Sequence, residues 1–241
     1  MDGICNYDYK IKTGTFDVGS GRKMRLSSVL KYQEQAGEEH LSEVFGLDYI
    51  TLSEKGVAFV LVNAAAKIHR MPTLGETLTI NTWNKQLKGL KFFRGYDWFD
   101  ENGEKIIEGV SAFVLVSIDE HKIVKPSELG IEFPEEKERE NSVGLPSKTH
   151  IPKEMSPIGS KTVFFSMLDS NEHLNNALYA DLIVDFLPID KARNIKGFTL
   201  DYVKEAKLGD KIEMFSAEED GKIYLQGLNK DTCCFRASVE F

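Results

Sequence analysis

The sequence has 241 residues, of which 41% are hydrophobic, and this is enough for one large domain or two small ones, each with its own core. The formal net charge of −8 argues against general nucleic-acid binding. No run of 18 apolar residues exists to span a membrane, and the first residues lack the apolar core of a signal peptide. Three cysteines make no disulfide framework, so we expect a cytoplasmic protein.

The first half of the chain predicts a strand, a long helix and then a series of strands. We expect a strand over residues 5–16, a glycine-rich turn, and a helix over about residues 25–45 that ends at Gly46. Strand-like segments follow over residues 57–117. The dipeptide Asn102-Gly103 lies between two of them and predicts a hairpin.

Residues 131–147 differ in character from what precedes them, because they are polar, charged and interrupted by Pro134 and Pro146. This composition predicts a linker. We therefore divide the chain into a first half over residues 1–130 and a second half over residues 148–241, which again begins with a strand and continues with a helix and more strands.

Two short matches relate the halves to each other. RLSSVL at residues 25–30 resembles HLNNAL at residues 173–178, and LGETLTI at residues 74–80 resembles LGDKIEM at residues 208–214. They occur in the same order and at equivalent places, which predicts a tandem duplication. Each half is then expected to be an antiparallel sheet whose apolar face is covered by one long helix.

The second helix is expected to begin directly after a polar segment. Leu174, Leu178, Leu182 and Phe186 recur every four residues and predict a helix that stops just before Pro188. The segment ahead of this helix, and its first turn, carry an unusual concentration of Asp, Asn and His.

Asp169, Asn171 and His173 alternate in this segment, which we expect to be extended, so that the three side chains lie on one side. Asn175 and Asn176 fall in the expected first turn of the helix. A helix N-terminus presents unpaired backbone N–H groups and a partial positive charge, which can hold a developing oxyanion.

Helix capping is the alternative for part of this cluster, because Asp and Asn are favoured N-caps. The first half argues against capping alone, since it has Asp17 and then VGSGRKMRL, with neither Asn nor His. A calcium loop fails on spacing, because Leu174 stands where the loop needs Gly and Ala180 where it needs Glu.

Glu205 is the second-half acid that completes the candidate catalytic set with Asp169, Asn171 and His173. A carboxylate near an imidazole, an amide and a helix N-terminus suits water activation and attack on an acyl carbon. Met71 occupies the matching first-half position, so this acid is not repeated. The alternative for Glu205 is a solvated acid at the end of a strand.

Other catalytic and cofactor motifs are absent from the sequence. There is no G-x-S-x-G, no phosphate-binding G-x-x-x-x-G-K-[ST] and no G-x-G-x-x-G. H-E-x-x-H and paired C-x-x-C are also missing, and the five histidines are dispersed, so we expect no metal site and no cofactor.

Two second-half motifs carry a family resemblance. The first is D-x-N-x-H-x-N-N-x-x-Y from Asp169 to Tyr179, and the second is Y-x-x-E-A-x-x-G-D from Tyr202 to Asp210. Weaker matches lie in the first half at Arg70, Pro72, Gly75, Thr82 and Trp83. In this order along nearly the whole chain, the motifs resemble those of the plant and bacterial acyl-acyl carrier protein thioesterases.

The resemblance implies an α+β fold, the tandem or double hotdog. In it, two long helices are each wrapped by an antiparallel sheet, and the sheets join edge to edge. It also implies hydrolysis of the thioester between a fatty acyl chain and the phosphopantetheine of an acyl carrier protein. This reaction releases the free fatty acid and ends chain elongation.

In this family reading, Glu205 orients or deprotonates the water, Asn171 and His173 position groups around the thioester, and Asp169 fixes the polar network. Backbone N–H groups near Asn175 receive the carbonyl oxygen. Plant members often carry a cysteine just after the catalytic Glu, whereas this chain has Ala206.

Three alternatives remain open: an acyl-coenzyme A thioesterase on the same fold, a non-catalytic acyl-binding hotdog protein, and a hydratase or dehydratase.

We expect the first half, which lacks the polar set, to hold the acyl chain with the apolar side chains of Val57, Phe59, Trp83 and Phe92. A homodimer is also compatible with the sequence. An acidic carrier protein needs a local basic surface, for which the candidates are Arg22, Lys23, Arg25, Lys191, Arg193 and Lys196.

Overall fold

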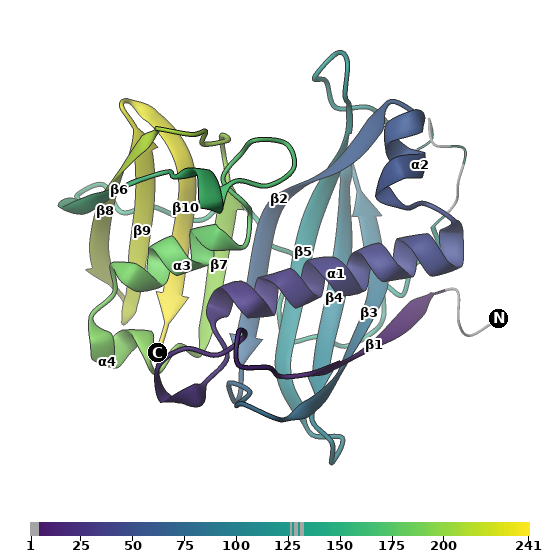
Figure 1. Ribbon diagram of the computed structural model, residues 1–241, viewed down its shortest axis with the longest axis horizontal. Coiled ribbons are helices and arrows are strands. Elements are labelled where there is room, and N and C mark those ends of the chain that lie inside the picture. The colour runs from purple at the N-terminus through teal and green to yellow at the C-terminus, as the bar shows by residue number, and fades with distance from the viewer. Residues whose placement is uncertain (1–4, 126, 128–129, 131–132) are drawn as a thin grey trace.

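The computed structural model describes residues 5–125, 127, 130 and 133–241. In this part of the chain, ten strands form one antiparallel sheet (Figure 1). Their order across the sheet is β1-β3-β4-β5-β2-β7-β10-β9-β8-β6. The bounds are β1 Asn6–Lys12, β2 Val57–Ile68, β3 Thr77–Lys88, β4 Lys91–Phe99, β5 Lys105–Ser117, β6 Ser156–Thr162, β7 Gly197–Tyr202, β8 Lys211–Glu219, β9 Lys222–Asn229 and β10 Thr232–Glu240.

The two halves of the sheet have the same connectivity. Counted inward from either outer edge, the strands of each half follow the order first, third, fourth, fifth, second. The halves meet where β2 and β7 pair antiparallel, with Asn63 opposite Asp201. The expected double hotdog, with its two sheets joined edge to edge, is therefore confirmed, and the repeated connectivity agrees with the predicted duplication.

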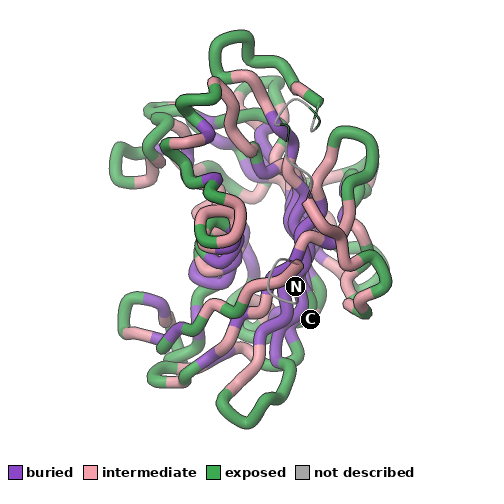
Figure 2. Tube along the Cα trace, turned by 90° about the vertical axis from the view of Figure 1, so that its right-hand side faces the viewer, coloured by how far each residue is buried: buried purple, intermediate pink, exposed green. Residues whose placement is uncertain are grey.

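One long helix, α1 (Leu26–Phe45), crosses the concave face of the sheet and ends at Gly46, whose φ of 64° is in the left-handed region. Figure 2 shows the helix in the hollow of the curved sheet, with its buried residues on the side that faces the strands. Three shorter helices are α2 (Tyr49–Glu54), α3 (Leu178–Asp185) and α4 (Ile189–Ala192). Among the described residues, no helix is long and apolar enough to cross a membrane.

The second helix is shorter than the sequence predicts. We expected it to begin near Leu174, but α3 has eight residues and begins at Leu178. The reason is that the N–H of Leu174 donates to Ala206 O at 2.8 Å, which holds this part of the chain extended. Leu174 is still buried, at 2% exposed. Its place in the repeating apolar pattern therefore indicates that the side chain is buried, not that the residue is helical.

Most of the segment predicted to be a linker is packed across the outer face of the sheet, opposite α1, whereas Phe133 at its start packs on the helix side against Phe45. Arg139 stacks on the ring of Trp83 at 3.8 Å, Ser142 bonds to Glu108 of β5, and Thr149 bonds to Asp201 of β7. We call residues 133–149 the strap; they comprise the described part of the predicted linker and the two residues that follow it. It crosses the first-half strands and reaches the second half, so its irregular backbone is held by side-chain contacts.

Candidate active site

The loop ahead of α3 is a tight turn rather than the extended segment we expected. Its two arms pair at Leu168 and Leu174, and the N–H of Asp169 donates to His173 O at 2.8 Å. Asp169 Oδ1 accepts the backbone N–H groups of Asn171 at 2.8 Å and of His173 at 3.1 Å. Asp169 therefore shapes the turn that presents Asn171 and His173, which fits its expected role of fixing the network.

The structure brings His173 and Glu205 together from two elements. His173 pairs with Lys207 as an isolated bridge, and this register places His173 Nε2 3.3 Å from Glu205 Oε2. The side chain of His173 is 25% exposed and that of Glu205 is 62% exposed, so a substrate and a water molecule can reach both. An imidazole and a carboxylate in contact at an open surface can accept a proton from water.

Asn175 and Asn176 differ in what their backbones can offer a substrate. The N–H of Asn175 donates to Met167 O at 3.0 Å, and Asn175 Oδ1 accepts the N–H of Ala177 at 3.0 Å. For the N–H of Asn176, no partner is found within the described part of the chain. Of the two backbone N–H groups, that of Asn176 is therefore the one without a partner in the described chain, while an oxyanion donor at this position stays a prediction.

Two first-half residues that the sequence reasoning missed also contact this site. The Tyr49 hydroxyl of α2 donates to Asn171 Oδ1 at 3.2 Å. The Asn176 side-chain amide donates to Glu34 Oε1 of α1 at 3.5 Å. Glu34 is four residues after Leu30, which is buried, so it borders the apolar face of the helix, and this position was the available signal.

Burial raises the pKa of the Glu34 carboxyl to about 7, and the negative charges of Glu38 and Asp169 add to the shift. The hydrogen bond from Asn176 opposes this shift but does not cancel it. Glu34 is thus a carboxyl that changes charge near neutral pH within reach of the candidate site.

The four acyl-chain candidates do not form one group. The rings of Phe59 and Phe92 are 5.1 Å apart, and both pack with Val57 in a cluster on the helix side of the sheet. Phe133 of the strap completes this cluster, with its ring 5.7 Å from that of Phe92. Trp83 lies on the opposite face beneath Arg139, so the structure separates it from the other three.

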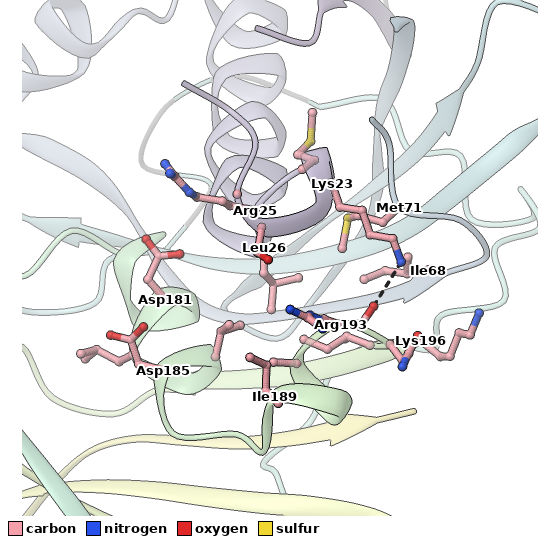
Figure 3. Close-up of a pocket in the computed structure, with 18 of the residues that line it drawn as sticks. Lys23, Arg25, Leu26, Ile68, Met71, Asp181, Asp185, Ile189, Arg193 and Lys196 are labelled. Atoms are coloured by element: carbon pink, nitrogen blue, oxygen red, sulfur yellow. Dashed lines mark hydrogen bonds between the residues drawn. The ribbon is translucent and has the colours of Figure 1, made fainter. Parts of the chain in front are cut away.

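A cleft of about 610 Å³ opens between the two halves near the start of α1. Figure 3 shows Lys23, Arg193 and Lys196 on one side of it and Asp181 and Asp185 on the other. The Lys23 ammonium donates to the carbonyl oxygen of Arg193 at 3.2 Å, which joins the two halves across the cleft.

The cleft gathers four of the six basic residues that we expected to form a docking surface. Arg25 lines it together with the three cations named above, whereas Arg22 and Lys191 lie outside its lining. Met167 and Leu178 also line the cleft, and they flank the turn that carries the candidate catalytic residues. The basic surface and the candidate catalytic turn are therefore neighbours.

Cys234, the cysteine next to the candidate site, does not have the environment of a nucleophile. Cys234 is far from Glu205 in sequence but close in space, because its carbonyl oxygen accepts the N–H groups of Val203 and Lys204 at 2.9 and 3.1 Å. Its side chain is buried, and this burial raises the pKa of the thiol. A reactive cysteine needs a lowered pKa and access to solvent.

Comparisons with known proteins agree with this geometry. The family model of the acyl-ACP thioesterase N-terminal domain matches residues 5–129, and that of the C-terminal domain matches residues 152–235. The oleoyl-acyl carrier protein thioesterase of Coriandrum sativum, a chloroplastic protein, is 22% identical over 90% of this chain. The chain spans 64% of that protein's length and 58% of the length of a dodecanoyl-[acyl-carrier-protein] hydrolase from Cinnamomum camphora.

Solved structures share the fold. An acyl-ACP thioesterase from Bacteroides thetaiotaomicron superposes with a TM-score of 0.89 at 22% identity, covering 98% of this chain and 97% of that one. The 12:0-ACP thioesterase from Umbellularia californica gives a TM-score of 0.74 at 19% identity, covering 98% and 96%. Because the two family models together match most of the sequence, the chain belongs to the acyl-ACP thioesterase family.

Proposed function

We propose that this protein hydrolyses the thioester between a fatty acyl chain and the phosphopantetheine of an acyl carrier protein, and so ends chain elongation. Membership of the acyl-ACP thioesterase family supports this reaction class. The observation that carries it is the contact of His173 with Glu205 at 3.3 Å, on a turn that also leaves the N–H of Asn176 unpaired among the described residues. These groups are the base and the oxyanion donor that hydrolysis needs.

The proposed reaction begins when a water molecule held by Glu205 attacks the thioester carbonyl carbon. The pair of Glu205 and His173 accepts the proton of this water as the new C–O bond forms. The carbonyl oxygen becomes an oxyanion and accepts a hydrogen bond from the backbone N–H of Asn176. The intermediate collapses, the C–S bond breaks, and the proton passes to the leaving thiolate of phosphopantetheine.

Asn171 and Asp169 act on the geometry of this step. Asp169 holds the turn through two backbone N–H groups, and Asn171 is held through its side-chain oxygen by Tyr49 of the first half. We propose that Asn171 keeps its side-chain NH₂ directed at the thioester or at the attacking water, because its oxygen is already used. Positioning of this kind lowers the barrier by restricting the reactants to a productive geometry.

We propose that the acyl chain lies on the helix side of the first-half sheet, against Val57, Phe59 and Phe92, which share one apolar cluster. The outer-face position of Trp83 removes it from this set.

The carrier protein is proposed to dock on the cleft cations, because the family's carrier proteins are acidic and complementary charge speeds association. A cytoplasmic location stays a prediction from the composition.

The test is incubation of the purified protein with a panel of acyl-acyl carrier proteins and acyl-coenzyme A thioesters, with released fatty acid measured. We expect hydrolysis of the carrier-protein substrates. Glu205→Ala and His173→Ala should each lower kcat by about 10²–10⁴-fold, the usual cost of losing a positioned base. A folded Glu205→Ala protein with near-normal kcat would falsify this assignment.

A variant with Cys5, Cys233 and Cys234 all changed to Ser or Ala is the matched control, and we expect it to keep most of its activity. An acyl group trapped on a cysteine would contradict the water mechanism. Hydrolysis confined to the coenzyme A thioesters would assign the protein to the alternative substrate class, and binding of acyl chains without release of acid would make it a non-catalytic binding protein.

A further inference from the structure

Asn176, whose N–H group has no partner among the described residues, is held by contacts from both halves of the molecule. Its side-chain amide donates to Glu34 Oε1 at 3.5 Å, and its carbonyl oxygen accepts the Tyr202 hydroxyl at 3.1 Å. One contact comes from α1 of the first half and the other from β7 of the second. The residue whose N–H is the proposed oxyanion donor is thus held from both halves of the molecule.

The Glu34 contact differs from the Tyr202 contact because Glu34 can change its charge near neutral pH. On the elements around it, the titratable groups are Lys31 and Glu38 of α1, Asp169 of the turn, Tyr202 of β7 and Tyr96 of β4. Burial raises the pKa of both tyrosines well above the usual value, so neither ionises near pH 7.

Ionisation of Glu34 places a negative charge on a carboxyl that contacts Asn176, the residue whose N–H is proposed to receive the developing oxyanion. Two like charges in a partly buried site repel each other strongly, because little water screens them. The neutral carboxyl avoids this repulsion and still accepts the hydrogen bond from Asn176 through its carbonyl oxygen. The two forms therefore keep the same contact but differ in their effect on an oxyanion.

We propose that Glu34 is a positioning residue of the oxyanion site: its neutral form holds Asn176 so that the backbone N–H faces the substrate carbonyl, and its ionisation slows the reaction. This inference rests on the proposed thioesterase function. Under this proposal, a residue of α1 in the first half controls the rate of a reaction whose candidate catalytic residues all lie in the second half.

The kinetic test compares kcat of Glu34→Gln with that of the wild type from about pH 5.5 to about pH 8.5. Gln copies the neutral carboxyl and cannot ionise. We expect similar rates at the acid end and a ratio of mutant to wild type that rises with a midpoint near 7. The ratio should reach about 10-fold by pH 8, because a carboxyl with a pKa of about 7 is then about nine-tenths ionised. Ionisation of Glu205 or His173 cancels in this ratio.

Glu39→Gln is the matched control, since Glu39 is also an acid of α1 but bonds to Gln35 and makes no hydrogen bond to Asn176. Its ratio to the wild type should stay constant with pH.

Glu34→Ala should lower kcat at pH 6 by roughly 10-fold with little change in KM. This is less than the roughly 10²–10³-fold cost of deleting an oxyanion donor. A pH-independent ratio for Glu34→Gln overturns the proposal.

A second measurement does not depend on catalysis. In ¹⁵N NMR spectra, the backbone and side-chain amides of Asn176 should shift with a midpoint near pH 7 in the wild type and lose this transition in Glu34→Gln. If the wild type releases no fatty acid, the proposed function fails, while the titration still decides whether Glu34 holds Asn176. Asn176 signals that do not respond to pH in the wild type overturn the positioning role.

Discussion

Val57 lies in the apolar cluster of Phe59 and Phe92, on the side of the sheet that faces α1. Replacing Val57 with Phe should fill space that the end of an acyl chain would occupy. A methylene is worth only about 1–3 kcal/mol of discrimination, so we expect the preferred chain to shorten by a few carbons while activity persists. Chromatography of the fatty acids released from a mixture of acyl-acyl carrier proteins measures this shift.

Val62→Phe is the control for this prediction. Val62 is on the same strand, but it packs with Phe93 on the outer face of the sheet. The bulkier side chain should therefore leave the product profile unchanged. If Val57→Phe and Val62→Phe give the same profile as the wild type, the acyl chain lies elsewhere.

At the scale of single residues, the sequence predicted which side chains meet at the candidate site, but not which backbone N–H groups lack a partner among the described residues. Spacing and the family resemblance identified His173 and Glu205, and the structure places them in contact. The different tasks of Asn175 and Asn176 depend on the carbonyl oxygen of Met167, which is positioned only by the folded turn. The role proposed for Glu34 depends on its contact with Asn176, which lies 142 positions away in the sequence, and no local pattern encodes such a contact.

At the scale of elements, long strands and α1 were predicted well, whereas the start of α3 was not. The periodic leucines indicate burial, and Leu174 satisfies that pattern from an extended segment. In the first half, the equivalent Leu26 begins α1. The second half thus starts its helix one turn later, and the N–H of Asn176, which has no partner among the described residues, lies in this unwound turn. Local propensity cannot predict this outcome, because tertiary hydrogen bonds override it.

The strap is the other element that the sequence predicted wrongly, because its polar composition suggested a linker. Its contact with Glu108 allows its contribution to stability to be tested. The carboxylate accepts the backbone N–H of Ser142 at 2.8 Å and its hydroxyl at 2.7 Å, and it contacts His69 at 2.9 Å. Burial alone would raise the pKa of Glu108, but these bonds outweigh burial and lower the pKa to about 2. The ionised carboxylate therefore stabilises the folded state.

Glu108→Gln should lower the free energy of unfolding at pH 7 by about 1–3 kcal/mol, because the lowered pKa corresponds to that order of stabilisation. This contribution is complete above the ordinary pKa of a glutamate and is lost as the pH falls toward 2. The difference between mutant and wild type should shrink over that interval in urea unfolding experiments. Glu101→Gln, at the exposed tip of the same hairpin, should behave like the wild type. Equal destabilisation at pH 7 and at pH 2.5 would contradict the assignment.

At the scale of the whole molecule, the cleft cations come from segments far apart in the sequence and meet only because the halves join. The double variant Arg193→Glu/Lys196→Glu should lower kcat/KM for an acylated carrier protein by about 10-fold at low salt and by less at high salt. A short pantetheine thioester should be hydrolysed at the wild-type rate. The double variant Lys55→Glu/Lys88→Glu, with Lys55 directly after α2 and Lys88 at the end of β3, lies outside the cleft lining and is the charge-matched control. Equal losses for both substrates would indicate a damaged site rather than lost docking.

The seam between β2 and β7 also has a consequence for how the chain folds. Asn63 and Asp201 form a hydrogen bond across the seam although they are 138 positions apart in the sequence. Closing the seam therefore costs more chain entropy than forming the hairpins within either half, whose strands are joined by short turns. During synthesis the first half emerges first, and β2 then presents an unpaired edge until β7 is made. Such an edge can pair with another chain. We therefore expect the nascent first half to be the aggregation-prone species, and the arrival of β7 to be the step that protects it.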